Sequence, residues 1–144
     1  MVNNDTIELL KECNAGIKMG ISSINEVLPM VSNKDLEQKL VTCREEHEKL
    51  ETETKQILND YDDAGENPNV MAKGMSWLKT NVKMAIKPDD ETISDLITDG
   101  CNMGVKSLNR YLNQYEAAEE KVKDITKRLI NLEEKLAIDI RQYL

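Results

Sequence analysis

The residues most capable of chemistry lie in one short stretch, CREEHEKLE, at residues 43–51. It contains the only histidine of the chain, His47, with four glutamates around it and Cys43 four residues before it. Imidazole, carboxylate and thiolate groups are common metal ligands, and an imidazole beside a carboxylate can transfer protons. The stretch therefore has two opposed interpretations: a metal or catalytic site, or a histidine packed inside a helix interface.

The spacing of apolar residues favours the packed histidine. Apolar positions recur at steps of four and three residues through this segment, as in the buried seam of a packed helix. His47 occupies one position of that seam, in the series Leu36, Leu40, Cys43, His47, Leu50, Thr54 and Ile57. Three interpretations of His47 stay open: a core histidine satisfied by hydrogen bonds, a partly exposed residue at the seam edge, and a ligand of a single metal ion.

The rest of the sequence carries no catalytic or cofactor motif. The segment NDYDDAGEN (59–67) begins like a calcium loop, but Met71 stands where a bidentate glutamate is required. Glycine-rich phosphate loops, GxSxG elbows and HExxH motifs do not occur. A catalytic triad would need His47, which its seam position makes inaccessible. We therefore predict that the protein has no catalytic residues, is not an enzyme and requires no cofactor.

Composition and charge argue against several classes of partner. The 144 residues include 27 acidic and 19 basic side chains, and the net charge of −8 repels nucleic-acid phosphates and anionic membrane surfaces. No apolar run is long enough to span a membrane, and the first residues do not resemble a secretory signal. Three cysteines without a CxxC pair indicate reduced thiols. We expect a cytoplasmic protein that binds neither nucleic acid nor membranes.

Helical periodicity predicts an all-α fold with four long helices, and an internal repeat relates them in pairs. GIKMGISSINEVL (16–28) aligns without a gap on GCNMGVKSLNRYL (100–112), with six identities in thirteen positions. A shift of two further residues brings the later helices into phase, with Leu36 on Val122 and Cys43 on Leu129. We therefore predict a four-helix bundle made of two repeated helical hairpins.

The predicted single domain, 1–144, consists of hairpin one (5–64), a crossover (65–88) and hairpin two (89–144). The crossover is long for a helix–helix connection, as expected if two hairpins of matching direction are joined by a segment that returns along the bundle. Within it we predict a short helix that presents Met71, Met75, Trp77, Leu78 and Val82.

Local signals place some of the helix ends. Asp5 with Glu8 predicts a capping box for the first helix, and Ser32 or Asn33 can cap the second. The turn of hairpin two is ambiguous, because NQYEAAEE (113–120) contains neither glycine nor proline. The repeat favours a turn there, whereas a continuous helix would lead to a swapped dimer.

His47 and Glu133 occupy equivalent positions in the two hairpins, and both fall on a core seam. Counting back through each turn places Gly16 near His47 and Gly100 near Glu133, where small residues leave room for larger polar ones. We predict that His47 and Glu133 face each other across the pseudo-twofold axis and make a buried, charge-assisted hydrogen bond. If a single metal ion binds instead, its candidate ligands are His47 and Glu133, with Cys43 or Glu51.

Two similar hairpins, a crossing segment with Gly74 and Trp77 before an LK pair, and the total length together resemble the ferritin-like superfamily. The closest resemblance is to small bacterial ferritin-like bundles of unassigned function. The resemblance implies a di-iron site built from two glutamates and two ExxH motifs. Here Arg44 stands three residues before His47, and Glu133 stands where the second histidine would be. So few ligands are present that we predict a degenerate site without iron.

Three functional hypotheses follow. The first is a non-catalytic ferritin-like bundle that acts through association with itself or with another protein. The alternative is a stress or iron-handling protein with a reduced metal site around His47 and Glu133. The third is small-molecule binding between the helices, which requires an apolar cavity beside the glycines.

Overall fold

A computed structural model describes residues 3–61 and 89–144, and within these ranges it contains four long helices and no strand. The long helices, followed in two places by a single turn of 3-10 helix, are α1 (Asn4–Val27), η1 (Leu28–Met30), α2 (Lys34–Asp60), α5 (Asp90–Gln114), α6 (Glu120–Ile140) and η2 (Arg141–Tyr143). The predicted all-α four-helix architecture is therefore confirmed for the described residues. The predicted crossover, with its short helix around Trp77, lies outside them.

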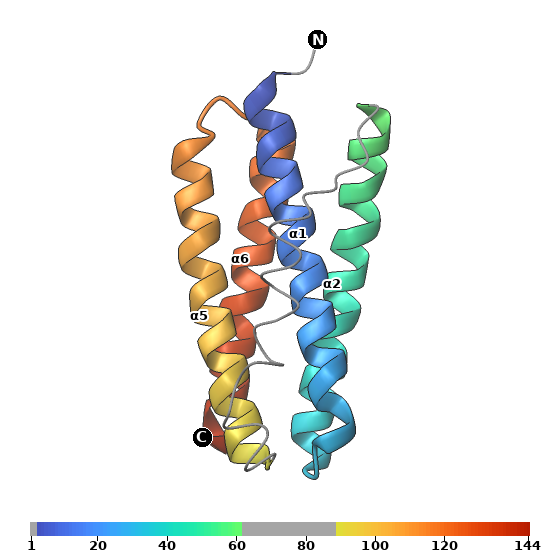
Figure 1. Cartoon of the computed structure of the whole chain (residues 1–144), viewed down its shortest axis with the longest axis vertical. Coiled ribbons are helices and arrows are strands. Elements are labelled where there is room, and N and C mark those ends of the chain that lie inside the picture. The colour runs from blue at the N-terminus through green and yellow to red at the C-terminus, as the bar shows by residue number, and fades with distance from the viewer. Residues whose placement is uncertain (1–2, 62–88) are drawn as a thin grey trace.

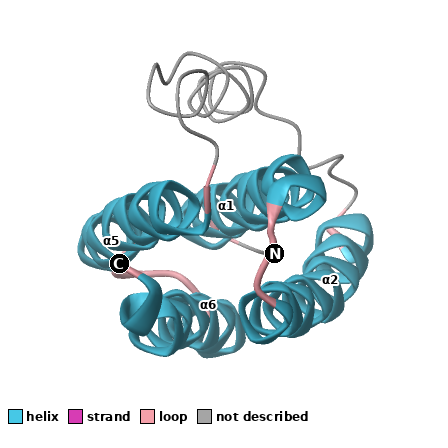
Figure 2. Ribbon diagram, turned by 90° about the horizontal axis from the view of Figure 1, so that it is seen from below, coloured by secondary structure: helices cyan, strands magenta, loops and turns pink. Residues whose placement is uncertain are grey.

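The four long helices form a bundle of two antiparallel hairpins, α1–α2 and α5–α6 (Figure 1). Helices α1 and α6 run in one direction and α2 and α5 in the other, so α2 ends and α5 begins at opposite ends of the bundle (Figure 1). Seen along the bundle, α2 and α5 lie at opposite corners, while α1 and α6 each pack against the other three helices (Figure 2).

Polar side chains cap the N-termini of three of the four long helices. Asn3 caps α1 by accepting the backbone N–H of Thr6 at 2.8 Å, so the predicted capping box at Asp5 is wrong by two residues. Asn33 caps α2 and Asp89 caps α5, and both side chains accept backbone N–H groups of the first turn. These caps satisfy N–H groups that have no partner within the helix.

A turn separates α5 from α6, as the repeat predicts, and the continuous helix that would have required a swapped dimer is absent from this segment. The α5 helix ends at Gln114, and the N–H of the next residue, Tyr115, donates to the Tyr111 carbonyl oxygen. The α6 helix begins after Glu119. Ala118, within the turn, is buried in the same core cluster as Leu9 of α1 and Val122 of α6. The turn forms without glycine or proline because its backbone is held by the start of α1.

The same kind of contact ties the hairpins together at both ends of the bundle. At one end, the Glu119 N–H donates to Thr6 Oγ1 at 2.9 Å. At the other, the Asn33 N–H donates to Asp90 Oδ2 at 2.9 Å. Thr6 and Asp90 are equivalent under the sequence repeat, as are Asn33 and Glu119. The first turn of each hairpin thus holds the loop of the other.

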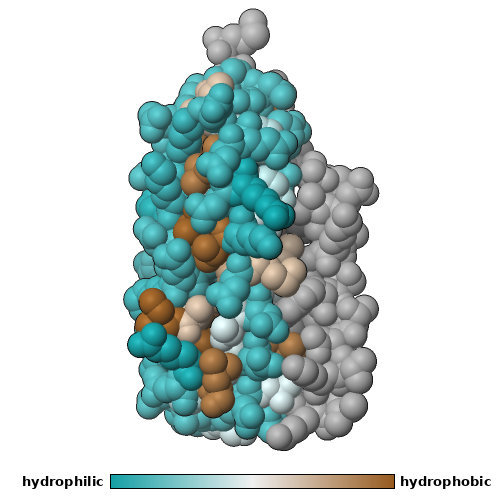
Figure 3. All heavy atoms as spheres, turned by 90° about the vertical axis from the view of Figure 1, so that its left-hand side faces the viewer, coloured by the Kyte–Doolittle hydropathy of each residue, from teal (hydrophilic) through white to brown (hydrophobic). Residues whose placement is uncertain are grey.

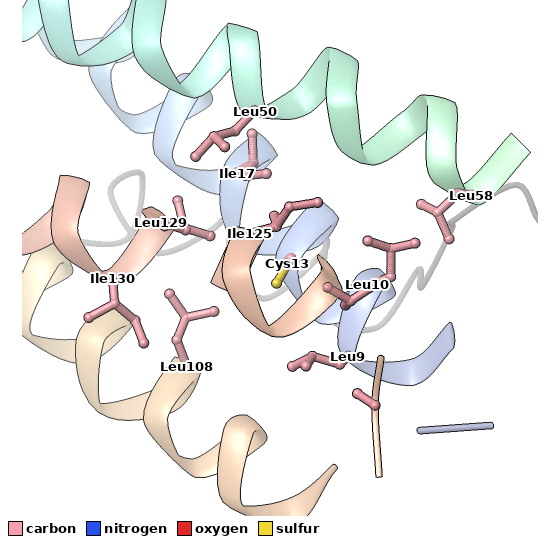
Figure 4. Close-up of a cluster of buried hydrophobic side chains, with 12 residues drawn as sticks. Leu9, Leu10, Cys13, Ile17, Leu50, Leu58, Leu108, Ile125, Leu129 and Ile130 are labelled. Atoms are coloured by element: carbon pink, nitrogen blue, oxygen red, sulfur yellow. The ribbon is translucent and has the colours of Figure 1, made fainter. Parts of the chain in front are cut away.

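Buried aliphatic side chains form two clusters, one toward each end of the bundle. The cluster nearer the start of α1 is shown in Figure 4 and includes Leu9, Leu10, Ile17, Leu50, Ile125 and Leu129. The second includes Ile24, Leu36, Leu40, Ile93, Leu96 and Ile140. These residues lie on apolar seams of the kind that helical periodicity predicts, whereas Leu144, which follows the end of α6, is 56 % exposed. Between the two clusters lies a polar layer.

Candidate functional site

The polar layer between the two clusters consists of His47 of α2 and Glu133 of α6, which are hydrogen bonded to each other. His47 Nε2 lies 2.9 Å from Glu133 Oε1, and the contact joins the two hairpins in the middle of the bundle. The side chain of His47 is 1 % exposed and that of Glu133 is 13 % exposed. The predicted buried pair is therefore confirmed, and of the three interpretations of His47 the structure supports the core histidine satisfied by hydrogen bonds.

Both ring nitrogens of His47 have partners, and this fixes the proton count of the pair. Nδ1 lies 2.8 Å from the Cys43 backbone carbonyl oxygen, which can only accept, so Nδ1 carries a proton. The short contact between Nε2 and Oε1 requires one further proton between those two atoms. The pair is then either imidazolium with carboxylate or imidazole with carboxylic acid, and its net charge is zero in both cases.

The surroundings of His47 act on its pKa in opposite directions. Burial lowers the pKa, because it penalises the charged imidazolium. The contacts with Cys43 and with Glu133 outweigh burial and raise the pKa of His47 from its ordinary value of 6.5 to about 10. At neutral pH His47 is consequently protonated and forms an ion pair with Glu133.

Two glycines make room for the pair, one helical turn from where the sequence placed them. A Cβ atom on Gly20 would lie 2.8 Å from His47 Nε2, and one on Gly104 would lie 3.7 Å from the Glu133 carboxylate. Gly16, predicted beside His47, faces Leu129 instead. The error has a geometric cause: counting residues back through each hairpin turn ignores the stagger between neighbouring helices.

A cavity of about 240 Å³ lies over the pair, between α1 and α5. The pair lines it together with Leu129 and Leu136, and glycine, serine and methionine residues of the two helices form its walls: Gly16, Met19, Gly20, Ser23, Gly100, Met103, Gly104 and Ser107. This cavity beside the glycines is what the small-molecule hypothesis requires. The glycines are its cause, since larger residues at these positions would fill it.

One end of the cavity is marked by Glu12 and Tyr111, which the sequence did not single out as a site. Burial raises the pKa of Glu12, hydrogen bonding to Tyr111 lowers it, and the charge of Glu8 raises it again, with a net increase. Glu12 lies on the flank of the α1 apolar stripe, so periodicity alone left its direction undecided. The position of α5 decides it, because α5 brings Tyr111 alongside.

The structure brings together only part of the proposed metal set. Cys43 Sγ lies 3.5 Å from His47 Nδ1, and Glu133 contacts the other nitrogen. Glu51 does not line the cavity and pairs with Lys55 at 3.7 Å. Among residues 3–61 and 89–144, no group of three or more histidine, cysteine, aspartate or glutamate side chains is arranged to hold a metal ion.

The three cysteines are buried and free. Burial raises the pKa of the Cys13 thiol to about 12, and its sulfur lies 3.0 Å from Thr126 Oγ1. Burial and the nearby Glu133 carboxylate also raise the pKa of Cys101. Thiols with raised pKa values are poor nucleophiles at neutral pH, so neither is equipped for redox or nucleophilic chemistry.

Fold and site together define a class: an all-α four-helix bundle with a buried His–Glu pair under an apolar cavity. No protein-family model matches the chain, and comparisons with curated proteins and with solved structures find no significant match. In the described part of the chain, none of the helices is both long enough and apolar enough to cross a membrane. The case for a function therefore depends on the chain's own residues.

Proposed function

We propose that this chain is a non-catalytic, ferritin-like helical bundle without a di-iron centre, and that it works by binding a ligand in the cavity between α1 and α5. The observation that carries the proposal is the cavity itself, with glycine walls and a hydrogen-bonded pair at its base. Well-packed bundles fill such spaces with side chains, so a retained cavity is the default position of a ligand.

Two features support the ferritin-like part of the proposal. Helices α2 and α5 run in the same direction at opposite corners, an arrangement that requires a connection along the length of the bundle, as in ferritin-like folds (Figures 1 and 2). The contacts of Thr6 and Asp90 at the two ends are related as a duplicated hairpin requires. The first feature is independent of the sequence alignment, whereas the second depends on it to relate Thr6 to Asp90.

The chemistry of the pair supports binding rather than catalysis. A general base needs a free nitrogen within reach of a substrate, and both nitrogens of His47 are already hydrogen bonded. A metal ligand needs a free lone pair as well. The alternative proposal, a reduced metal site used in stress or iron handling, therefore requires a metal ion to replace the proton between His47 and Glu133.

Association with another protein or with a second copy has less support from the described surface. The side of the bundle on which α5 lies is mostly hydrophilic, with separate apolar patches (Figure 3). In the described ranges the exposed large hydrophobic residues are Met30, Met103, Ile138 and Leu144. Partner surfaces are usually larger continuous apolar areas, whereas the cavity is a formed concave site.

The proposal is tested by fragment binding observed in NMR spectra of the untagged protein. Small apolar fragments are expected to shift the amide signals of Gly16, Gly20, Gly100 and Gly104 and to leave surface residues such as Lys49 unchanged. Metal content is measured on the same sample by emission spectroscopy. Stoichiometric metal that is lost in His47→Ala would overturn the proposal in favour of the metal site, and absence of any fragment binding would overturn it as well.

A further inference from the structure

The shape of the cavity restricts what can enter it. Its lining on α1 runs from Glu12 to Ile24, roughly 18 Å along the axis at about 1.5 Å per residue. A volume of about 240 Å³ spread over that length is narrow. An engineered pocket of about 150 Å³ accommodates benzene, so the volume suffices for a small molecule, but its length suits one extended chain better than a ring system.

The walls are apolar and adaptable over most of that length. Glycine backbone forms the middle of both sides, and Ile24, Ile97 and Leu136 line the end away from Glu12. Met19 and Met103 lie on either side, and methionine adjusts to the shape of an apolar ligand. An alkyl chain would bury its methylene groups here at about 0.8 kcal/mol each.

The charges of the lining are unbalanced. The described residues around the cavity include no lysine or arginine, and their only ionisable carboxylates are Glu12 and Glu133. The His47–Glu133 pair has no net charge, so Glu12 contributes the net charge of the lining. The charge of Glu8, a second carboxylate, also acts on Glu12, whereas the Arg110 guanidinium, which does not line the cavity, acts on Tyr111. This end of the cavity therefore favours a cation.

We propose that the cavity binds a linear alkyl chain that carries one ammonium group, with the ammonium beside Glu12 and Tyr111 and the chain extending over the His47–Glu133 pair. Glu12 is half-buried, so the ammonium keeps part of its water while it contacts the carboxylate. The Tyr111 ring adds a cation–π contact. This inference specifies the ligand class and rests on the proposed function.

The experiment is a titration of the full chain with n-octylamine, n-octanol and octanoate, below their aggregation concentrations, followed by calorimetry and by the glycine amide signals. The three probes share a chain and differ in charge. Octylamine is expected to bind roughly tenfold more tightly than octanol, and octanoate most weakly, because of the Coulomb interaction with Glu12. Glycine signals should shift with both octylamine and octanol.

Three variants locate the interaction. Glu12→Gln should reduce octylamine affinity to that of octanol and leave octanol unchanged, whereas Glu134→Gln, an exposed residue with the same charge change, should alter neither. Gly104→Leu should abolish binding of both probes, provided that its thermal melting is like that of the natural chain. If it fails to fold, the Glu12 and Glu134 variants still decide the question.

Each contrary outcome has a separate meaning. Equal affinity for octylamine and octanol, both sensitive to Gly104→Leu, would overturn the ammonium preference and leave the proposed function intact. Octylamine binding that survives Gly104→Leu in a folded variant would place the amine on the acidic surface and overturn the inference. Binding by none of the three probes would overturn both the inference and the proposed function.

Discussion

At the scale of single residues, His47 and Glu133 place a polar contact where the bundle would otherwise have a continuous aliphatic core. Taking two ionisable groups out of water costs free energy, and an uncompensated partner costs more. The pair therefore restricts which faces of the two hairpins can pack together, because each buried group needs the other. Its protonation and its close contact with Gly20 each lead to a prediction.

The stability of the protein is expected to fall as the pH rises above about 6.5. The folded state holds the His47 proton up to a pKa of about 10, whereas the unfolded chain releases it near 6.5. The contribution of His47 protonation to stability is thus complete below the pKa of the unfolded chain, and it is lost as the pH rises from there to the pKa of the folded state. The free energy of unfolding should decline by up to about 1.4 kcal/mol per pH unit.

Urea unfolding at intervals from pH 6 to pH 8 measures this decline, below the ordinary pKa of 9.0 at which the thiols of Cys13 and Cys101, whose folded-state pKa values are raised, lose protons in the unfolded chain. His47→Gln keeps an amide near Glu133 but has no proton to lose in that range. Its stability should be nearly constant over the same interval. A natural chain as insensitive to pH as the variant would contradict the raised pKa.

Two glycine-to-alanine substitutions should have opposite effects. An alanine Cβ at position 20 would lie 2.8 Å from His47 Nε2 and 2.9 Å from Cδ2, so the imidazole must move, at a cost of about 1–3 kcal/mol. At position 104 the closest atoms are at 3.7 Å, an ordinary contact, and alanine's higher helix propensity should stabilise by up to about 1 kcal/mol.

The two substitutions are each other's control, since both add one methyl group to a glycine of the same repeated motif. Urea midpoints of Gly20→Ala and Gly104→Ala decide the matter. Equal midpoints would show that His47 shifts without cost and that the close contact at Gly20 has no consequence for stability.

At the scale of helices, the ends of each hairpin are held by the other hairpin. Asp90, the first residue of α5, accepts the N–H groups of Ser32 and Asn33 at 2.8 and 2.9 Å. These N–H groups belong to the loop that leads into α2, and Asn33 also caps that helix. One carboxylate thus connects the start of α5 with the start of α2.

Asp90→Ala is expected to destabilise the protein by about 1–2 kcal/mol, because two backbone donors lose a charged acceptor. The matched control is Glu91→Ala, which removes the same charge from the same first turn. Chemical denaturation of both variants compares them. Equal losses would mean that the helix dipole, rather than the contact with the α1–α2 loop, accounts for the effect.

At the scale of the whole molecule, two similar hairpins could also pair with copies of themselves. Each hairpin alone leaves its apolar face exposed and needs a partner to bury it. Pairing of hairpin one with itself would place His47 against His47, and hairpin two would place Glu133 against Glu133. The unlike pair therefore favours the arrangement in which the two hairpins of one chain meet.

Separate peptides 1–64 and 85–144 are expected to form a 1:1 complex when mixed, with more helix than the sum of the two alone. Circular dichroism and native mass spectrometry measure this. His47→Glu in the first peptide should weaken the complex, and Glu133→His in the second should restore it. Self-pairing as strong as mixed pairing would show that the buried pair does not select the partner.

The sequence by itself determined the helices, their buried seams and the pairing of His47 with Glu133. These features follow from local periodicity and from the repeat, which relates positions of equal depth in the two hairpins. Leu40, Leu50, Ile125 and Leu129 are buried where the 3.6-residue period places them. The cap at Asn33 was also predicted, because a short polar side chain precedes the helix there.

The tertiary structure alone decided which glycine meets the pair, how the loops are held and where the cavity lies. Gly20 rather than Gly16 contacts His47 because the stagger between α1 and α2 depends on packing along their whole length. Glu12 belongs to the cavity because α5 passes beside it. Distances between helices are set by all their side chains together, and no local pattern in the sequence encodes them.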